Sequence, residues 1–258
     1  MCGIVGYVGP REATPIIING LKRLEYRGYD SAGVAVINNG QIDVRRDAGK
    51  LQQLVDLVGK SPLIGAPGIG HTRWATHGAP SARNAHPHVG NTGTMVVVHN
   101  GIVENFLELK DELGAEGVKF NSDTDTETIV HLAENHKAAG ISFEEAARRT
   151  FKQIEGANVV LLLSTDEPDK IIAARIGNAG GVVVGLGDGE NFLASDIPAI
   201  LEHTRKMIFL ESRQMVVVTK DSVRIETLDG EPVTPEIHNI SFDAVSAEKG
   251  EYRHFMQK

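Results

Sequence analysis

Short apolar runs recur along the chain and predict buried β-strands. They are rich in Val and Ile and are bounded by Gly, Asn or Asp, as buried strands usually are. The runs cover residues 4–8, 33–37, 95–98, 159–163, 171–174, 182–186 and 215–218. The glycine-containing stretch GLGDGEN at residues 185–191 has the wrong spacing for a dinucleotide-binding loop, and we predict a hairpin turn there.

Helical spacing of apolar residues is found in fewer places, at residues 15–24, 125–136 and 142–151. In the third segment Ser142 stands three residues before Glu145, the pattern of a capping box at a helix start. The helices are segregated from several strand pairs. This arrangement favours an α+β fold, with helices packed outside antiparallel sheets, over a regular parallel α/β sheet.

Composition narrows the class of protein. The chain has 258 residues, 41% of them hydrophobic and 23% charged, which is typical of a soluble globular protein with one large domain or two small ones. A net charge of -8 argues against nucleic-acid binding, which needs a basic face. No apolar run is long enough to span a bilayer, and no signal-peptide pattern is visible. We therefore expect a cytoplasmic protein that binds neither nucleic acid nor membrane.

The only cysteine, Cys2, is the first candidate for chemistry. One thiol excludes an intrachain disulfide and fits a reducing compartment. Because Cys2 is small, we expect removal of Met1 to expose its α-amine. That amine has a reference pKa of about 7.7–8.0, so near neutral pH it can take the thiol proton directly or through a water. On position alone, the interpretation of Cys2 as an incidental small hydrophobic residue is favoured.

Five segments then point to one family. They are MCGIVGYVG (1–9), LEYRGYDSAG (24–33), GHTRWATHG (70–78), VVVHNGIVEN (96–105) and NSDTDTE (121–127). In this order they resemble the glutaminase domain of the glutamine:fructose-6-phosphate amidotransferases, a branch of the class II, N-terminal-nucleophile amidotransferases. The Cys-Gly-Ile start is shared across the class, whereas the segments at 24–33 and 70–78 are specific to the branch. The similarity continues through residues 185–201 to residues 247–258.

The resemblance implies a fold and an activity. The expected fold is a four-layer αββα sandwich of two antiparallel sheets, the N-terminal-nucleophile hydrolase fold. A glutaminase domain would span residues 1–240, and residues 241–258 would begin a linker to an absent sugar isomerase region. L-glutamine would be hydrolysed to glutamate and ammonia through a γ-glutamyl thioester on Cys2. The full-length enzyme, expected to be a homodimer, would use the ammonia to make glucosamine 6-phosphate from fructose 6-phosphate, without a cofactor.

The resemblance also assigns roles to individual residues. The side-chain amide of Asn100 and the backbone N–H of Gly101 match the oxyanion hole, although an Asn-Gly pair alone is also a simple turn. Arg73 matches the residue that binds the substrate α-carboxylate. Asp125 matches the acid that holds the α-ammonium group, and its position before a helix also suits an N-cap.

Further assignments concern the segment at residues 70–78, which we predict to be a loop that also carries Arg73. Thr76, His77 and Gly78 match substrate contacts made partly through the backbone. Trp74 matches a residue of the loop that folds over bound glutamine and helps gate ammonia passage. For the only tryptophan of the chain, ordinary core packing is the alternative.

Other interpretations remain open at this point. Five histidines lie within a short stretch, namely His71, His77, His86, His88 and His99. Their density suggests zinc, but no Cys or acid pattern accompanies them and the family needs no metal. A papain-like pair of Cys2 with His77 or His99 is a second alternative for the thiol. At the level of function, the alternatives are a non-catalytic glutamine sensor and an amidohydrolase with another substrate.

Overall fold

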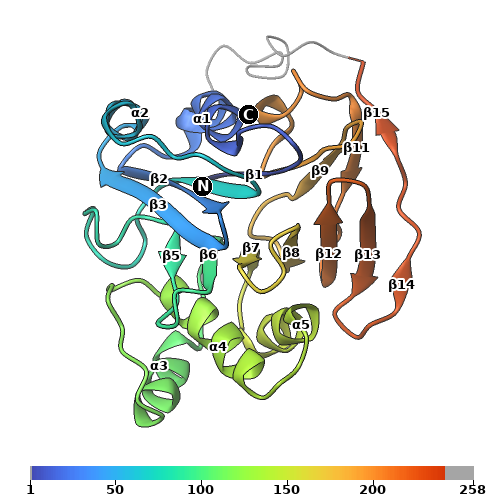
Figure 1. The fold of residues 1–258 in the computed structure, drawn as a ribbon. Helices are drawn as coiled ribbons and strands as arrows, with labels where there is room; N and C mark the ends of the chain where they lie inside the picture. The colour runs from blue at the N-terminus through green and yellow to red at the C-terminus, as the bar shows by residue number, and fades with distance from the viewer. Residues whose placement is uncertain (1, 242–258) are drawn as a thin grey trace.

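A computed structural model describes residues 2–241, which fold into two antiparallel sheets with helices on the outside (Figure 1). One sheet has eight strands in the order β15-β11-β9-β10-β1-β4-β2-β3. Its strands are β1 (Gly3–Val8), β2 (Ser31–Asn38), β3 (Gln41–Ala48), β4 (Gly68–Arg73), β9 (Val183–Leu186), β10 (Asn191–Ala194), β11 (Lys206–Phe209) and β15 (His238–Asn239).

The second sheet has seven strands in the order β14-β13-β12-β8-β7-β6-β5. Its strands are β5 (His88–Val89), β6 (Met95–Gly101), β7 (Asn158–Ser164), β8 (Lys170–Ile176), β12 (Gln214–Thr219), β13 (Val223–Thr227) and β14 (Pro232–Val233). All of the strands predicted from apolar runs are confirmed by the two sheets. The GLGDGEN turn is confirmed as well, because β9 and β10 form an antiparallel pair closed by a hydrogen bond from the Gly187 N–H to the Glu190 carbonyl.

The helices form the two outer layers (Figure 1). α1 (Ala13–Leu24) and α2 (Leu51–Lys60) cover the eight-stranded sheet, while α3 (Phe106–Ala115), α4 (Thr126–Ala138) and α5 (Phe143–Gln153) cover the seven-stranded sheet. The predicted α+β fold, a four-layer αββα sandwich of two antiparallel sheets, is confirmed. None of the helices within residues 2–241 has the length and apolar character needed to cross a membrane.

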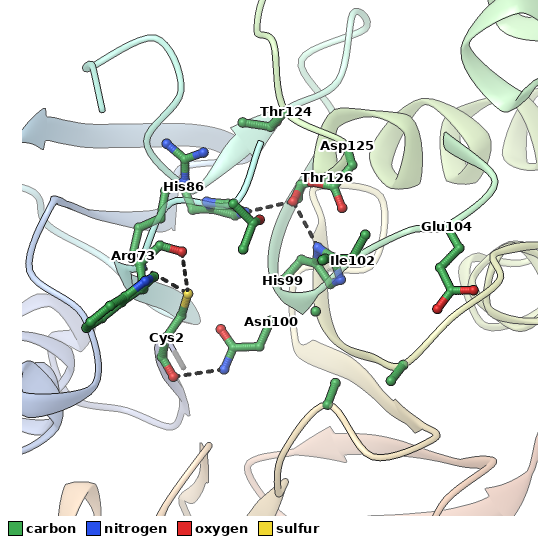
Figure 2. Close-up of a pocket in the computed structure, with 15 residues that line it drawn as sticks. Cys2, Arg73, His86, His99, Asn100, Ile102, Glu104, Thr124, Asp125 and Thr126 are labelled. Atoms are coloured by element: carbon green, nitrogen blue, oxygen red, sulfur yellow. Dashed lines mark hydrogen bonds between the residues drawn. The ribbon is translucent and has the colours of Figure 1, made fainter. Parts of the chain in front are cut away.

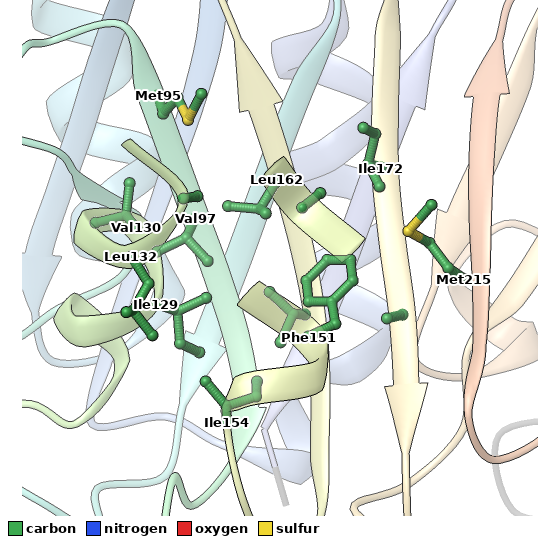
Figure 3. Close-up of a cluster of buried hydrophobic side chains, with 14 of the residues drawn as sticks. Met95, Val97, Ile129, Val130, Leu132, Phe151, Ile154, Leu162, Ile172 and Met215 are labelled. Atoms are coloured by element: carbon green, nitrogen blue, oxygen red, sulfur yellow. The ribbon is translucent and has the colours of Figure 1, made fainter. Parts of the chain in front are cut away.

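Burial on both faces explains the uninterrupted apolar strands. On β7, Leu161 belongs to the cluster between the two sheets, whereas Leu162 belongs to the cluster beneath the helices. Figure 3 shows this second cluster, in which Phe151 of α5 packs toward Leu162 and Ile172 of the sheet. A strand covered on both faces gains from apolar residues at every position, so alternation disappears.

The predicted helix starts and ends agree with the structure within two residues. The capping box is present at α5, where the Ser142 hydroxyl accepts a hydrogen bond of 3.2 Å from the Glu145 N–H. The segment 247–258 and nearly all of the predicted linker at 241–258 lie outside the described residues. Three strand ends from two sheets determine the position of the site, namely the start of β1 and the ends of β4 and β6.

Candidate active site

A cavity of about 380 Å³ lies where these strand ends meet the start of α4 (Figure 2). It is lined by Cys2, Arg73, Trp74, Thr76, His86, His99, Asn100, Gly101, Ile102, Glu104, Thr124, Asp125, Thr126, Ala157 and Ala179. Seven of the nine residues that the sequence assigned to the site are in this set. His77 and Gly78 are the two that are not.

Cys2 immediately precedes β1, an interior strand paired with both β4 and β10. Its Sγ accepts a hydrogen bond of 3.1 Å from the Trp74 backbone N–H, and the thiol lies 3.6 Å from the Trp74 carbonyl. A side chain at Gly3 would meet Thr72 Oγ1 at 2.6 Å, so only glycine fits beside Cys2. The thiol is therefore held at the cavity by a fixed strand and by the backbone of Trp74.

The protonation state of the thiol follows from its surroundings. Burial raises the pKa of the Cys2 thiol, and the hydrogen bond from the Trp74 backbone and the Arg73 charge counteract this effect only partly. The thiol is thus predominantly protonated near neutral pH. Since the thiolate is the reactive form, attack by this cysteine requires a base.

Asn100 and Gly101 are the last two residues of β6. The Asn100 Nδ2 donates a hydrogen bond of 3.1 Å to the Cys2 carbonyl, joining the two sheets. Gly101 has φ 135°, and a side chain there would lie 2.2 Å from the Ala157 carbonyl. The hairpin-turn interpretation of this Asn-Gly pair is wrong, because both residues pair with β7.

Arg73 is buried at 3% exposure. Its placement in a loop was wrong: it is the last residue of β4, where Ser31 of β2 is its partner. Its Nη2 donates to the carbonyls of His77 and Gly78, while its Nη1 is buried and has no hydrogen-bond partner among residues 2–241. A buried guanidinium nitrogen with an unused donor is suited to bind an anion in the cavity.

Asp125 stands directly before α4 and is also buried at 3% exposure. Its side chain makes no capping hydrogen bond to α4. Instead, its Oδ2 accepts a hydrogen bond of 2.8 Å from the Val103 N–H, which leaves the other carboxylate oxygen available. The alternative role as a side-chain N-cap is therefore wrong.

The segment after β4 forms the outer rim of the cavity. Trp74 is 50% exposed and contacts Tyr29 edge to face, with ring centroids 5.8 Å apart, so the core-packing interpretation is wrong. His77 and Gly78 act through their carbonyls on Arg73 and not as part of the lining. Asp30, which the sequence did not suggest, accepts a hydrogen bond from the Ala75 N–H and anchors this rim.

Several residues that line the cavity were not predicted to belong to the site. They are Ile102, Glu104, Thr124, Thr126, Ala157 and Ala179. Two of them continue the VVVHNGIVEN segment beyond Gly101, a signal that could have been followed further. Ala157 and Ala179 come from connections beside β7 and β8, and nothing in their local sequence indicates a cavity.

The histidines do not form a metal centre. Within the part of the chain that the structure describes, no three His, Cys, Asp or Glu side chains are arranged to hold a metal ion. Burial lowers the pKa of His71 and of His88 to about 3, so both rings are neutral at physiological pH. The hydrogen bonds of His99 go to Thr126 and Asn158. The described hydrogen bonds of Cys2 Sγ likewise involve only Trp74, so no papain-like pair is present.

Comparisons with known proteins agree with this geometry. Residues 71–202 match the model of a family described as a glutamine amidotransferase domain. The chain is 51% identical to a protein of Aquifex aeolicus and 50% identical to one of Thermus thermophilus. Both are named glutamine--fructose-6-phosphate aminotransferase [isomerizing]. Each match covers 100% of this chain but only 43% and 42% of those proteins, so the chain spans less than half the length of these relatives.

Solved structures with the same fold were also found. A structure titled as the allosteric regulatory enzyme of purine biosynthesis has a TM-score of 0.77 at 24% identity, covering 88% of this chain and 49% of its own. The glutamine phosphoribosylpyrophosphate amidotransferase of B. subtilis has a TM-score of 0.76 at 23% identity, again over 88% of this chain and 49% of its own. At this identity the likeness establishes the fold.

Proposed function

Because this chain belongs to the glutamine amidotransferase domain family, we propose that it hydrolyses the carboxamide of L-glutamine to glutamate and ammonia. One observation carries the proposal: the Cys2 thiol and the Asn100 carboxamide, from different sheets, meet in a cavity that also contains a buried cation and a buried anion. Those two charges are Arg73 and Asp125. A free α-amino acid carries the complementary pair of charges.

Substrate binding follows from this charge pattern. The unused Nη1 of Arg73 binds the α-carboxylate, and the carboxylate of Asp125 binds the α-ammonium group. Both groups are buried, so these charge-assisted hydrogen bonds are strong and select for a free amino acid. The side-chain carboxamide of glutamine then extends toward Cys2.

Activation of the nucleophile requires a base, since burial raises the pKa of the Cys2 thiol. The base in this proposal is the α-amine of Cys2, which exists only after Met1 has been removed. The amine takes the thiol proton while the sulfur–carbon bond forms. It then returns the proton to the departing nitrogen, and ammonia leaves as a γ-glutamyl thioester is formed. Water, deprotonated by the same amine, attacks the thioester and releases glutamate.

Both steps pass through a tetrahedral oxyanion. A carboxamide nitrogen has two N–H donors, and one N–H of Asn100 is bonded to the Cys2 carbonyl. The second N–H, together with the backbone N–H of Gly101, stabilises the oxyanion. Donors that are fixed before the reaction lower the barrier because they need no reorganisation when the charge develops.

The rim segment controls access in this scheme. Trp74 and Thr76 cover the bound amino acid, and the carbonyls of His77 and Gly78 hold Arg73 in position. The position of Trp74 supports this assignment, since its half-exposed ring lies at the rim of the cavity, where it can contact a bound ligand. We further assign Trp74 to directing ammonia away from bulk water.

The longer relatives suggest the destination of the ammonia. In the proposed whole protein, residues 1–240 are the glutaminase domain and the remaining length carries a sugar isomerase that aminates fructose 6-phosphate. The names of the relatives support this assignment. A homodimeric, cytoplasmic enzyme without a cofactor completes the proposal.

The direct test is ammonia release from L-glutamine by the chain without Met1, compared with the Cys2→Ala variant. We expect the variant to lose at least about 1000-fold in kcat while keeping its fold, because the nucleophile is absent. L-asparagine and simple acyl amides serve as alternative substrates. Glutamine binding without ammonia release would contradict the proposal and favour a sensor, and equal hydrolysis of acyl amides would favour a broader amidohydrolase.

A further inference from the structure

We propose that His71 is a positioning residue that fixes the orientation of the Asn100 carboxamide, so that its N–H groups face Cys2. The inference rests on the proposed function, because orientation matters only if Asn100 stabilises an oxyanion. His71 does not line the cavity but contacts the side chain of Asn100, which does. Its Nε2 is 3.0 Å from the Asn100 Oδ1 and 3.0 Å from the His99 carbonyl.

Two backbone carbonyls determine which way the amide points. The His99 carbonyl can only accept a hydrogen bond, so the His71 Nε2 beside it must carry a proton. That same N–H faces the Asn100 side chain, and the atom it meets must be the oxygen. At the other end the Cys2 carbonyl also only accepts, so the amide nitrogen must face Cys2.

Neighbouring side chains form a chain of hydrogen bonds in which each donor can be assigned. The Asn158 Nδ2 donates to the Glu155 carbonyl, so its Oδ1 accepts a hydrogen bond from the His99 Nε2–H. The His99 Nδ1 therefore accepts from the Thr126 hydroxyl at 2.9 Å. With its only proton used, Thr126 Oγ1 accepts from the His86 Nε2–H, also at 2.9 Å. The two bonds to Thr126 are drawn as dashed lines in Figure 2.

The ring of His71 is itself held firmly. It lies on β4, in register with Ile4 of β1 and Gly33 of β2, and it is fully buried. It also stacks on His86, with ring centroids 4.2 Å apart and an interplanar angle of 27°. Burial lowers the pKa of His71 to about 3, so the ring stays neutral and keeps a single donor at physiological pH.

The opposite orientation of the Asn100 carboxamide would be unfavourable for the reaction. If the Asn100 carboxamide turned by 180°, its oxygen would face the Cys2 carbonyl and the developing oxyanion, and both contacts would be repulsive. In the observed orientation His71 satisfies the oxygen, and the nitrogen keeps one donor for the reaction. His71 thus acts on the rate through Asn100 and leaves the glutamine-binding charges of Arg73 and Asp125 unaffected.

The test compares His71→Met with His71→Gln in the chain without Met1. Met removes the donor at similar side-chain length, whereas Gln restores an N–H near the position of Nε2. We expect His71→Met to lose about 10- to 100-fold in kcat with KM for glutamine nearly unchanged, since it weakens an oxyanion donor without removing it. We expect His71→Gln to recover most of that loss.

His88→Met is the matched control. It removes a second fully buried histidine, which bonds to Thr124 and Arg46 and not to Asn100. Equal kcat loss in His88→Met and His71→Met, at equal stability, would overturn the inference. So would a His71→Gln variant as slow as His71→Met.

A second readout does not depend on activity. Hydrogen exchange of the Asn100 side-chain N–H groups, followed by NMR, should be slow in the wild type and in His71→Gln but faster in His71→Met. Unchanged exchange in His71→Met would overturn the inference even if the wild type failed to release ammonia. Failure of the wild type to release ammonia, with exchange as expected, would refute the proposed function while leaving the positioning of the amide established.

Discussion

The two walls of the cavity are built differently. At its rim, the wall from the eight-stranded sheet carries the partly buried Cys2 and the half-exposed Trp74, and this rim is held mainly by bonds to backbone atoms. The wall from the seven-stranded sheet carries Asn100 and His99, at 5% and 3% exposure, and is held by bonds between buried side chains. We infer from this difference that the first wall supplies the nucleophile and covers the substrate, whereas the second wall holds fixed donors for the transition state.

The largest expected effect is a loss of stability in acid, which comes from the buried wall. Burial lowers the pKa of four histidines whose hydrogen bonds hold this wall. His71 reaches Asn100 from β4 of the opposite sheet, and the other three are His86, His88 and His99. Below about pH 6.5 these histidines are protonated in the unfolded chain but stay neutral in the native state. The free energy of unfolding therefore falls as the pH falls toward the native pKa of His71 and His88, which is about 3. His71 and His88 each lower the free energy of unfolding by about 1.4 kcal/mol per pH unit in this range.

One neighbouring group opposes this trend. His131 is buried, but the carboxylates of Glu127 and Glu134 outweigh the effect of burial and raise its pKa, so it adds stability below pH 6.5. The net loss between about pH 7.5 and pH 5.5 is therefore on the order of a few kcal/mol. Urea unfolding at the two pH values measures it. A free energy of unfolding that stays level across this range would show that the histidines are not buried in the neutral form.

The next effect separates the two walls by activity. Asn100→Ala removes an oxyanion donor from the fixed wall, and we expect about a 100- to 1000-fold lower kcat with a small change in KM. Asn191→Ala is the matched control, since Asn191 is an equally buried asparagine that donates to the Thr219 carbonyl outside the cavity. Steady-state kinetics on both variants provide the measurement. A loss in KM alone for Asn100→Ala would place the residue in substrate binding.

The smallest of the three effects concerns Arg73, at the end of β4 on the wall from the eight-stranded sheet. Arg73→Lys keeps the charge but loses the planar fork, so we expect KM for glutamine to rise about 10- to 100-fold with kcat nearly preserved. Arg45→Lys is the control, because Arg45 makes a similar fork to the Ser61 hydroxyl away from the cavity. A kcat loss as large as that of Asn100→Ala would erase the distinction between the walls.

Much of the fold could be predicted from the sequence because strands buried on both faces leave long apolar runs, as on β7. β3 (Gln41–Ala48) escaped prediction because it is an edge strand of half-exposed, largely polar residues. α2 and α3 were also missed. The order of strands depends on pairings between distant segments, such as β1 with β10, which local patterns do not encode.

The residues of the site also fall into a predictable and an unpredictable group. Cys2, Arg73, Asn100 and Asp125 lie in recognisable motifs, and the structure brings all four to one cavity. The role proposed for His71 was not visible, because the density of histidines suggested a metal and only the fold shows which atoms they face. Ala179 was missed because its contribution depends on where a turn passes in space.

The most direct test of the central claim is labelling of Cys2 by a γ-electrophilic glutamine analogue, followed by intact-mass measurement. In the proposed mechanism the thiol is activated by its own α-amine. We therefore expect one adduct, mapped to Cys2, on the chain that lacks Met1, and greatly slowed labelling on the chain that retains Met1. Equally fast labelling of both chains, or no adduct on the folded chain that lacks Met1, would contradict it.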